Sequence, residues 1–245
     1  MMATGKRSRR GVIWAVLGAG VLAIAIIAIL ASGLFGQSPT PTRTSEPAPD
    51  PSSTTTQASS PSQAVVDESA TENGWIPEPI TTDPDPYIRA ALAAASTFDT
   101  QKSTRNEWLS YLDTWFTPDT RYTSAQDRED DMRASQLELR QGVVLPEDEW
   151  NSLANEDGRV VAAVRGDITY SDVPDDTSGD MTIGTADVIL TYTRAEASGK
   201  ESSYDETVRV SVQVLCGEGS IPTPDSAQQP GDCKVVRYFS GSLEP

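Results

Sequence analysis

One uncharged apolar stretch near the N-terminus limits what this chain can fold into. Residues 12–31 carry no charged side chain and follow a basic cluster made of Lys6, Arg7, Arg9 and Arg10. A helix rises about 1.5 Å per residue, so a run of about 20 residues spans roughly 30 Å, the thickness of a bilayer's hydrocarbon core. Because basic flanks stay in the cytoplasm, the cluster predicts a cytoplasmic N-terminus and an extracytoplasmic remainder.

We interpret residues 11–35 as an uncleaved signal-anchor preceded by a cytoplasmic basic tail, residues 1–10. The alternative is a cleaved signal peptide, whose apolar region usually runs about 7–15 residues and ends at a small-x-small site. Here the run is longer, and the nearest candidate site, Ala31-Ser32-Gly33, fits that pattern weakly. The sequence therefore predicts a single-pass protein of the cell membrane.

A stretch rich in Pro, Ser and Thr follows the predicted span. Between Gln37 and Gln63, 13 of 27 residues are Ser or Thr, and prolines are interleaved with them. Such a composition cannot bury enough apolar surface to offset the entropy lost on ordering, which predicts a disordered stalk over residues 36–83. A short apolar patch at Trp75 and Ile76 is expected to dock on the folded domain as a strap.

Charge and composition argue against several classes of function. Beyond the predicted span the chain has 15 Lys and Arg against 36 Asp and Glu, a formal net charge of −21. Such a surface repels nucleic acid and anionic lipid headgroups, so we expect no nucleic-acid partner. The chain contains no histidine, which removes Ser-His-Asp and Cys-His catalysis and His-ligated zinc.

The two cysteines, Cys216 and Cys233, are expected to form a disulfide. Both follow the predicted span and so lie on the oxidising side of the membrane. The loop between them is rich in Gly, Pro, Ser and Gln, and the pair lacks the C-x-x-C spacing of redox sites. We therefore interpret the pair as a structural crosslink that restrains a floppy loop.

The folded domain is expected to span residues 84–245, and its first half has helical periodicity. An apolar stripe over residues 87–98 predicts a first helix. A capping box at Thr104 and Glu107 begins a second helix, which carries a heavy aromatic face. Further helices are expected over residues 128–140 and 146–153.

The second half of the domain changes to the alternating pattern of strands. Valines at every second position over residues 208–214 predict a strand with one buried face. The predicted strands are residues 159–170, 181–194, 208–214 and 234–240. No helical pattern separates them, so the predicted fold class is α+β, with N-terminal helices packed on a curved four-stranded antiparallel sheet.

We assign no catalytic, cofactor-binding or metal-ligating residue. The acidic clusters at residues 127–131, 147–149 and 172–176 do not match a calcium-binding loop, so we interpret them as solvated surface. Asp99 and Asp113 lie next to aromatic residues, where a carboxylate can act as a general base. Asp113 falls off the aromatic stripe of its predicted helix, however, and is expected to face water.

The order of these elements resembles a known architecture. An anchor helix, a stalk, two or three helices and then an antiparallel sheet are similar to the nuclear-transport-factor-2-like (cystatin-like) fold. Single-pass bacterial members with this layout resemble the bitopic core subunit of type IV secretion and conjugation machines. Others, from GC-rich Gram-positive bacteria, are associated with lipid-import systems. The resemblance covers about residues 84–239 and carries over no site residue.

The resemblance implies three functions. The leading hypothesis is a membrane-tethered, non-enzymatic scaffold that binds protein partners in a cell-envelope transport complex, without a cofactor and with homo-oligomerisation left open. The alternative is a small-molecule or lipid binding module that uses a cavity between helices and sheet. The third hypothesis is an isomerase-like or dehydratase-like enzyme with an acid in that cavity.

Overall fold

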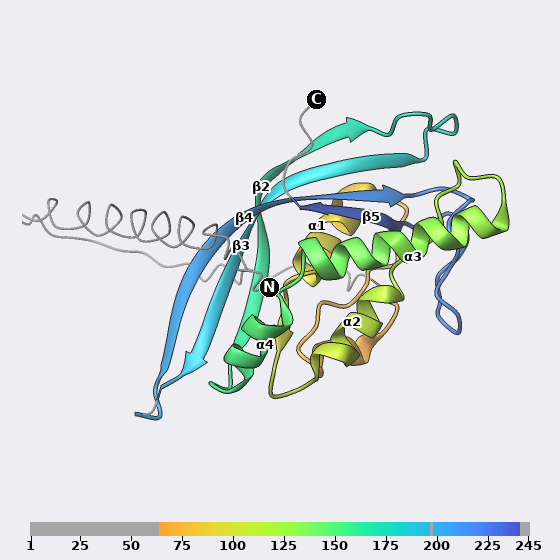
Figure 1. Ribbon diagram of the computed structural model, residues 1–245. Coiled ribbons are helices and arrows are strands. Elements are labelled where there is room, and N and C mark those ends of the chain that lie inside the picture. The colour runs from red at the N-terminus through yellow and green to blue at the C-terminus, as the bar shows by residue number, and fades with distance from the viewer. Residues whose placement is uncertain (1–63, 197, 241–245) are drawn as a thin grey trace, which may run out of the picture. The chain divides into compact units, whose positions relative to one another are not determined.

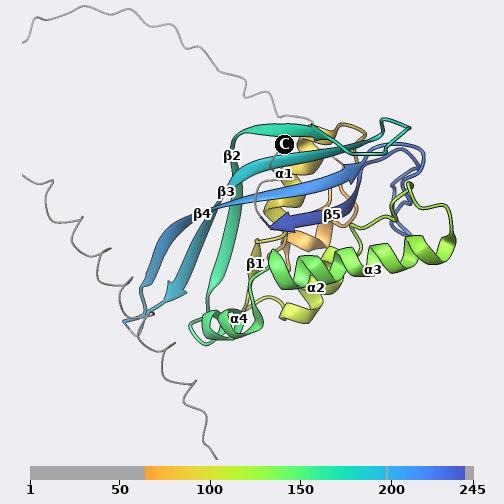
Figure 2. The ribbon, with the colours of Figure 1, turned by 45° about the horizontal axis from the view of Figure 1, so that its top comes forward.

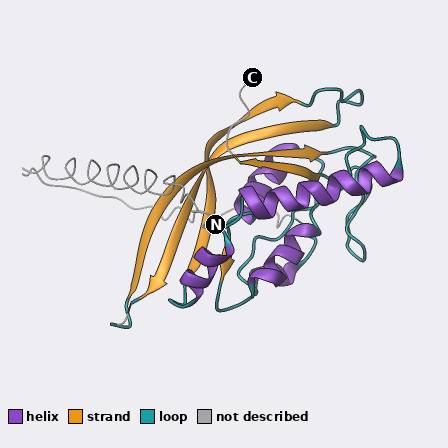
Figure 3. Cartoon of the chain, in the orientation of Figure 1, coloured by secondary structure: helices purple, strands orange, loops and turns teal. Residues whose placement is uncertain are grey.

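A computed structural model describes residues 64–196 and 198–240, which form four α-helices packed on a curled five-stranded antiparallel sheet (Figure 1). A short 3-10 helix, Glu68–Thr71, comes first. The α-helices are α1 (Pro84–Ala94), α2 (Arg105–Asp113), α3 (Ala125–Gly142) and α4 (Glu147–Ala154). The strands are β1 (Phe98–Asp99), β2 (Arg159–Asp172), β3 (Met181–Ala195), β4 (Glu201–Leu215) and β5 (Lys234–Ser240), and they are neighbours in that order. Figure 3 shows the helices gathered on one side of the sheet.

The sheet has one strand more than the four that we predicted. The additional strand β1 consists of Phe98 and Asp99 and pairs with the start of β2. The first helix ends at Ala94 instead of continuing to Phe98. Thr97 explains this end, because its hydroxyl donates to the Ala93 carbonyl at 2.9 Å and accepts from the Ala162 N–H at 3.0 Å. This side chain turns the chain out of the helix and onto the sheet.

The predicted antiparallel meander is confirmed for β2, β3, β4 and β5. Strand β4 is longer than predicted, because it begins at Glu201 and not at Val208. It pairs with β3 in continuous register from Met181–Leu215 to Ala195–Glu201. The added residues are hydrophilic and exposed, so they carry no alternating apolar signal.

Residues 64–83, which we assigned to the stalk, belong to the fold. The Trp75 ring stacks on Tyr111 of α2 with centroids 4.8 Å apart, and its indole N–H donates to Ser103 at 2.8 Å. The predicted strap is therefore confirmed, and the boundary that we placed at Pro84 is too late. Composition alone did not reveal this boundary, because the surface that buries the strap lies on α2.

The remaining predictions for the N-terminal part concern residues 1–63, which lie outside the described residues. These are the basic cluster of Lys6, Arg7, Arg9 and Arg10, the span over residues 11–35, and the rest of the stalk. Among the residues that the structure does describe, no helix has the length and hydropathy needed to cross a bilayer.

An aromatic cluster holds α2 and α4 against the first strand. The Phe98 ring lies 4.9 Å from Trp108 and 4.0 Å from Trp150, measured between ring centroids. All three side chains are buried. The heavy aromatic face predicted for the second helix thus forms core, and the capping box of Thr104 and Glu107 is present as predicted.

Candidate functional site

An apolar cavity of about 360 Å³ lies between the sheet and the segment that joins α3 to α4. The sheet contributes aliphatic and aromatic side chains to its lining, namely Phe98, Val160, Leu190, Tyr192, Val208 and Val210. Residues 141–146 form the facing wall. This volume falls within the range of about 300–1,000 Å³ that is typical of pockets for small ligands or inserted side chains.

The local sequence explains why these side chains meet. Successive side chains of a strand point to opposite faces, so Leu190 and Tyr192 share one face of β3, and Val208 and Val210 share the same face of β4. The facing wall is held in place by Arg105 of α2, whose guanidinium donates to the Leu145 carbonyl at 3.1 and 3.3 Å.

The chemistry of this cavity suits binding by burial of apolar surface. Arg209 is the one charged side chain in its described lining, and it pairs with Asp187 at 2.8 Å. Among the residues that the structure describes, no carboxylate lines the cavity. In the part of the chain that the structure describes, no three His, Cys, Asp or Glu residues gather in a way that would hold a metal ion.

Neither carboxylate singled out in the sequence lines this cavity. Asp99 belongs to β1, and its side chain accepts from the Gln101 N–H at 2.9 Å. Asp113 forms an ion pair with Arg140 of α3, and its side chain is 28% exposed. Asp113 is therefore only partly exposed to water, because α3 brings a cation to it from 27 residues away.

The sheet beside the cavity has an unpaired edge. Strand β4 pairs with β3 along its full length, but it pairs with β5 only from Val210 to Leu215. Within the described part of the chain, residues 201–209 therefore have no strand on their other side. Figures 1 and 2 show the β3–β4 hairpin running on beyond the end of β5. Alternate residues of such an edge direct N–H and C=O groups outward, which makes it a template for a further strand.

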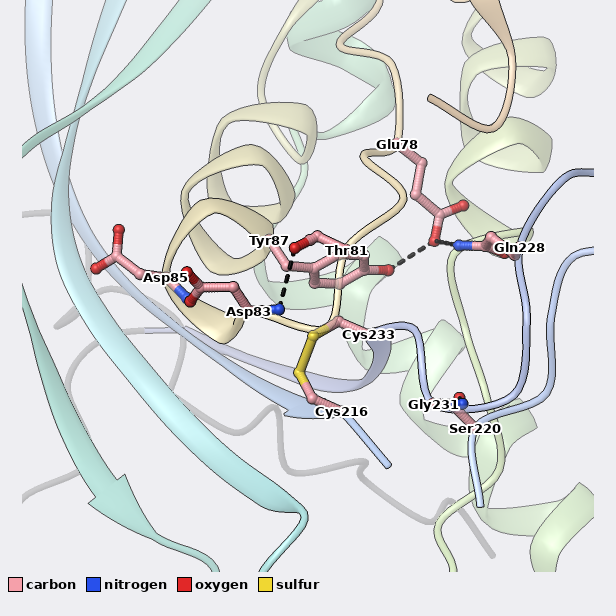
Figure 4. Close-up of a disulfide and its surroundings, with 10 residues drawn as sticks. All are labelled: Glu78, Thr81, Asp83, Asp85, Tyr87, Cys216, Ser220, Gln228, Gly231 and Cys233. Carbon is pink, nitrogen blue, oxygen red and sulfur yellow. Dashed lines mark hydrogen bonds between the residues drawn. A yellow bond between two sulfur atoms is a disulfide. The ribbon is translucent and has the colours of Figure 1, made fainter. Parts of the chain in front are cut away.

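A buried polar cluster lies in another part of the domain, and our sequence analysis missed it. The side chains of Glu78 and Lys234 are 0% and 1% exposed, and their charged atoms are 2.9 Å apart. The Tyr87 hydroxyl donates to the same Glu78 oxygen at 2.6 Å, and the Gln228 amide donates to it at 3.2 Å (Figure 4). The ammonium group of Lys234 also donates to the Thr114 carbonyl at 2.7 Å. The nearby Trp75–Ile76 patch was the only sequence signal for this cluster.

The predicted disulfide joins Cys216 to Cys233 directly beside this cluster (Figure 4). It connects the end of β4 to the start of β5. The loop that it closes carries Gln228, which contacts Glu78. The Cys233 N–H donates to the Thr81 carbonyl at 2.7 Å, which attaches residues 64–83 to β5. The crosslink thus supports the contacts that hold the strap.

Burial shifts the pKa of both Glu78 and Lys234. Burial raises the pKa of Glu78 above its ordinary value of 4.5, although Lys234 and the hydrogen bonds act in the opposite direction. Burial also lowers the pKa of Lys234 below its ordinary value of 10.5, with Glu78 opposing that shift. Glu78 Oε2 has no hydrogen-bond partner among the described residues. Burial thus moves the pKa of each member toward neutral pH.

We expect the stability that depends on Glu78 to fall as pH rises. A carboxyl whose pKa is raised by folding binds more protons in the folded state, so its contribution is present below 4.5 and is lost as pH rises through the raised pKa. The measurement is the free energy of unfolding in urea from about pH 4 to pH 7 for the unmodified chain and for Glu78→Gln. The difference between them should shrink or reverse with increasing pH, and parallel profiles would contradict the assignment.

No protein-family model matches the chain, and no curated protein matches it. Among solved structures, it is similar to an IcmL-like type IV secretion system protein from Legionella pneumophila, with a TM-score of 0.40, 13% identity, and 64% of this chain and 88% of that chain covered. A periplasmic fragment of TraM has a TM-score of 0.37 and 12% identity, and the match covers 63% of this chain and 92% of the fragment. CagV, a VirB8 homolog from Helicobacter pylori, has a TM-score of 0.30 and 14% identity, with 57% and 82% covered. Two of these three proteins are described as type IV secretion proteins, the group that the order of elements resembles.

Proposed function

We propose that this chain is a membrane-tethered, non-enzymatic domain that binds a protein partner outside the cytoplasm. The observation that carries the proposal is the apolar cavity placed beside the unpaired edge of β4. A cavity takes up an apolar side chain, and an unpaired edge binds a backbone. A protein segment supplies both groups at once.

The predicted anchor and stalk support this proposal. A disordered stretch of about 27 residues, such as 37–63, reaches roughly 30 Å in root-mean-square length before prolines extend it. Such a spacer suits a partner held away from the membrane surface, and it offers little to an enzyme acting on a freely diffusing substrate. The order of elements resembles the bitopic core subunit of secretion and conjugation machines, so we place the partner in a cell-envelope transport complex of that kind.

The test is photo-cross-linking from the cavity wall in intact cells. A photoreactive amino acid at Leu145, which lines the cavity, should form a discrete protein adduct, whereas the same group at the exposed Glu72 should not. Filling the cavity with Val208→Trp should abolish the adduct while far-ultraviolet circular dichroism stays unchanged. Deleting residues 37–63 should weaken the adduct without lowering the melting temperature. Equal labelling from both positions would contradict the proposal.

A small apolar ligand is the second candidate function, and the apolar lining of the cavity favours it. Native mass spectrometry of the full chain in detergent tests it directly. A co-purifying small molecule or lipid that Val208→Trp removes would favour this function over protein binding.

A further inference from the structure

We propose that the free edge of β4, residues 201–209, binds a basic, extended segment of a partner protein as an additional strand of the sheet. This inference deepens the proposed function and rests on it. It adds the binding mode, which is backbone pairing, and the chemistry of the segment, which is Arg or Lys alternating with an apolar residue on one face.

The backbone of this edge is regular, and no strand among the described residues pairs with it. Proteins usually guard a sheet edge with charged side chains, above all lysine, with proline, with a bulge or with a covering segment. Residues 201–209 contain neither proline nor lysine and pair with β3 without a register shift, and their charged side chains, Glu201, Asp205, Glu206 and Arg209, are mostly acidic. All of them except the half-buried Val208 are exposed. The opposite edge differs, because β2 has a register shift between Arg165 and Thr169, and Arg89 donates to the Gly166 carbonyl at 3.0 Å.

The side chains along this edge favour a basic segment. Tyr204 stacks on Tyr192 with ring centroids 4.9 Å apart, and both rings line a hollow of about 190 Å³ together with Glu149 and Glu206. Neither glutamate has an ion-pair partner among the described residues. The cation in this hollow, Arg194, is already paired with Glu156 at 3.0 Å and lies 5.8 Å from the centroid of the Tyr204 ring. A Lys or Arg of the added strand would therefore run its aliphatic stem past the edge of Tyr204 and place its charge beside the two carboxylates.

The position of the cavity sets the spacing within the segment. Tyr204, Glu206 and Val208 alternate along β4 on the face that bears the hollow and the cavity. A strand paired beside them would therefore carry its basic residue next to Tyr204 and Glu206. Its apolar residue would follow two positions away, next to Val208 and the cavity.

Charge also favours a basic segment over a second copy of the chain as the strand that pairs with β4. Two β4 edges paired with each other would bring Asp205 and Glu206 of both copies together. Neither side chain has a cation partner in the described part of the chain. Like charges on neighbouring strands are destabilising, and the formal net charge of the chain is −17. The same negative charge attracts a basic partner.

The probe is a fluorescent synthetic peptide in which every second residue is Thr and the others alternate between Arg and Val. Its binding to the full chain in detergent is followed by fluorescence anisotropy at physiological salt. Two N-methylated versions block either the Thr amides or the Arg and Val amides. Because only one set of N–H groups faces β4, one version should lose binding and the other should keep it. Equal binding of both versions, and of a peptide with shuffled sequence, would overturn strand addition.

Two matched double variants test whether the carboxylates beside Tyr204 contribute to peptide binding. Glu149→Lys with Glu206→Lys should weaken peptide binding by about tenfold, since two favourable contacts become repulsive. Glu72→Lys with Glu218→Lys changes the net charge equally at exposed sites elsewhere and should change affinity less than about twofold. Equal losses, or a dimer that the first pair strengthens, would overturn the assignment. Cross-linking from Leu145 that persists despite such results would leave the proposed function standing without strand addition.

Discussion

Lys234→Met is expected to lower the free energy of unfolding by about 3–5 kcal/mol, because it leaves a buried carboxylate without its cation. Glu78 is 0% exposed, and within the described ranges Lys234 supplies the only positive charge that contacts it. Methionine keeps most of the volume of the side chain, so the loss reports charge and hydrogen bonding more than packing. Urea unfolding at about pH 7 measures it.

Two further variants make this result specific. Glu78→Gln combined with Lys234→Met removes both charges and should recover much of the loss, because exchanging a buried pair for neutral groups is often close to neutral. Arg133→Met removes the cation that Glu129 and Asp130 share on α3, where all three side chains are more than half exposed, and it should cost at most about 1 kcal/mol. A Lys234→Met loss no larger than the Arg133→Met loss would show that the buried pair does not hold the strap.

Replacing both cysteines by serine is expected to cost about 2–4 kcal/mol of stability. The disulfide closes a loop between residues 17 apart in sequence, and without it the unfolded chain gains conformational freedom. The loop also positions Gln228, which donates a hydrogen bond to Glu78. The cysteine variant and Lys234→Met therefore both weaken the contacts of Glu78. Combining the cysteine variant with Lys234→Met should therefore cost less than the sum of the separate losses.

Unfolding in urea under non-reducing conditions measures the cysteine effect. Reductant should destabilise the unmodified chain by a similar amount and leave the serine variant unchanged. Non-reducing peptide mapping of protein taken from the cell envelope should recover Cys216 and Cys233 as one linked species. Two alkylatable thiols in that sample would contradict the crosslink.

Elements whose signal is local were predicted well from the sequence. The capping box at Thr104 and Glu107 needs only neighbouring residues, and it is present. The valines of β4 alternate with polar residues, so their period was visible without any contact map. The expectation that only one face of this strand is buried is wrong, because Ser211 and Gln213 on the other face are 0% and 3% exposed. The disulfide followed from the predicted compartment.

Features that depend on distant partners were missed or misplaced. Glu78 was assigned to the stalk, since nothing near it in sequence indicates that Lys234 lies beside it. Asp113 was expected to face water, but Arg140 of α3 pairs with it. The first half of β4 is hydrophilic on both faces, so only its pairing with β3 makes it a strand.

The sequence by itself determined the order of helices and strands, the antiparallel meander, the disulfide and the acidic character of the domain, because each follows from local periodicity, spacing or composition. Only the tertiary structure decided where the folded part begins and which charges are buried as partners. In the described part of the chain, it also decided that β5 pairs with β4 only from Val210 to Leu215, which leaves residues 201–209 without a further strand beside an apolar cavity. The physical reason is that burial, ion pairing and strand pairing are properties of two surfaces, and the second surface lies tens to more than a hundred residues away along the chain.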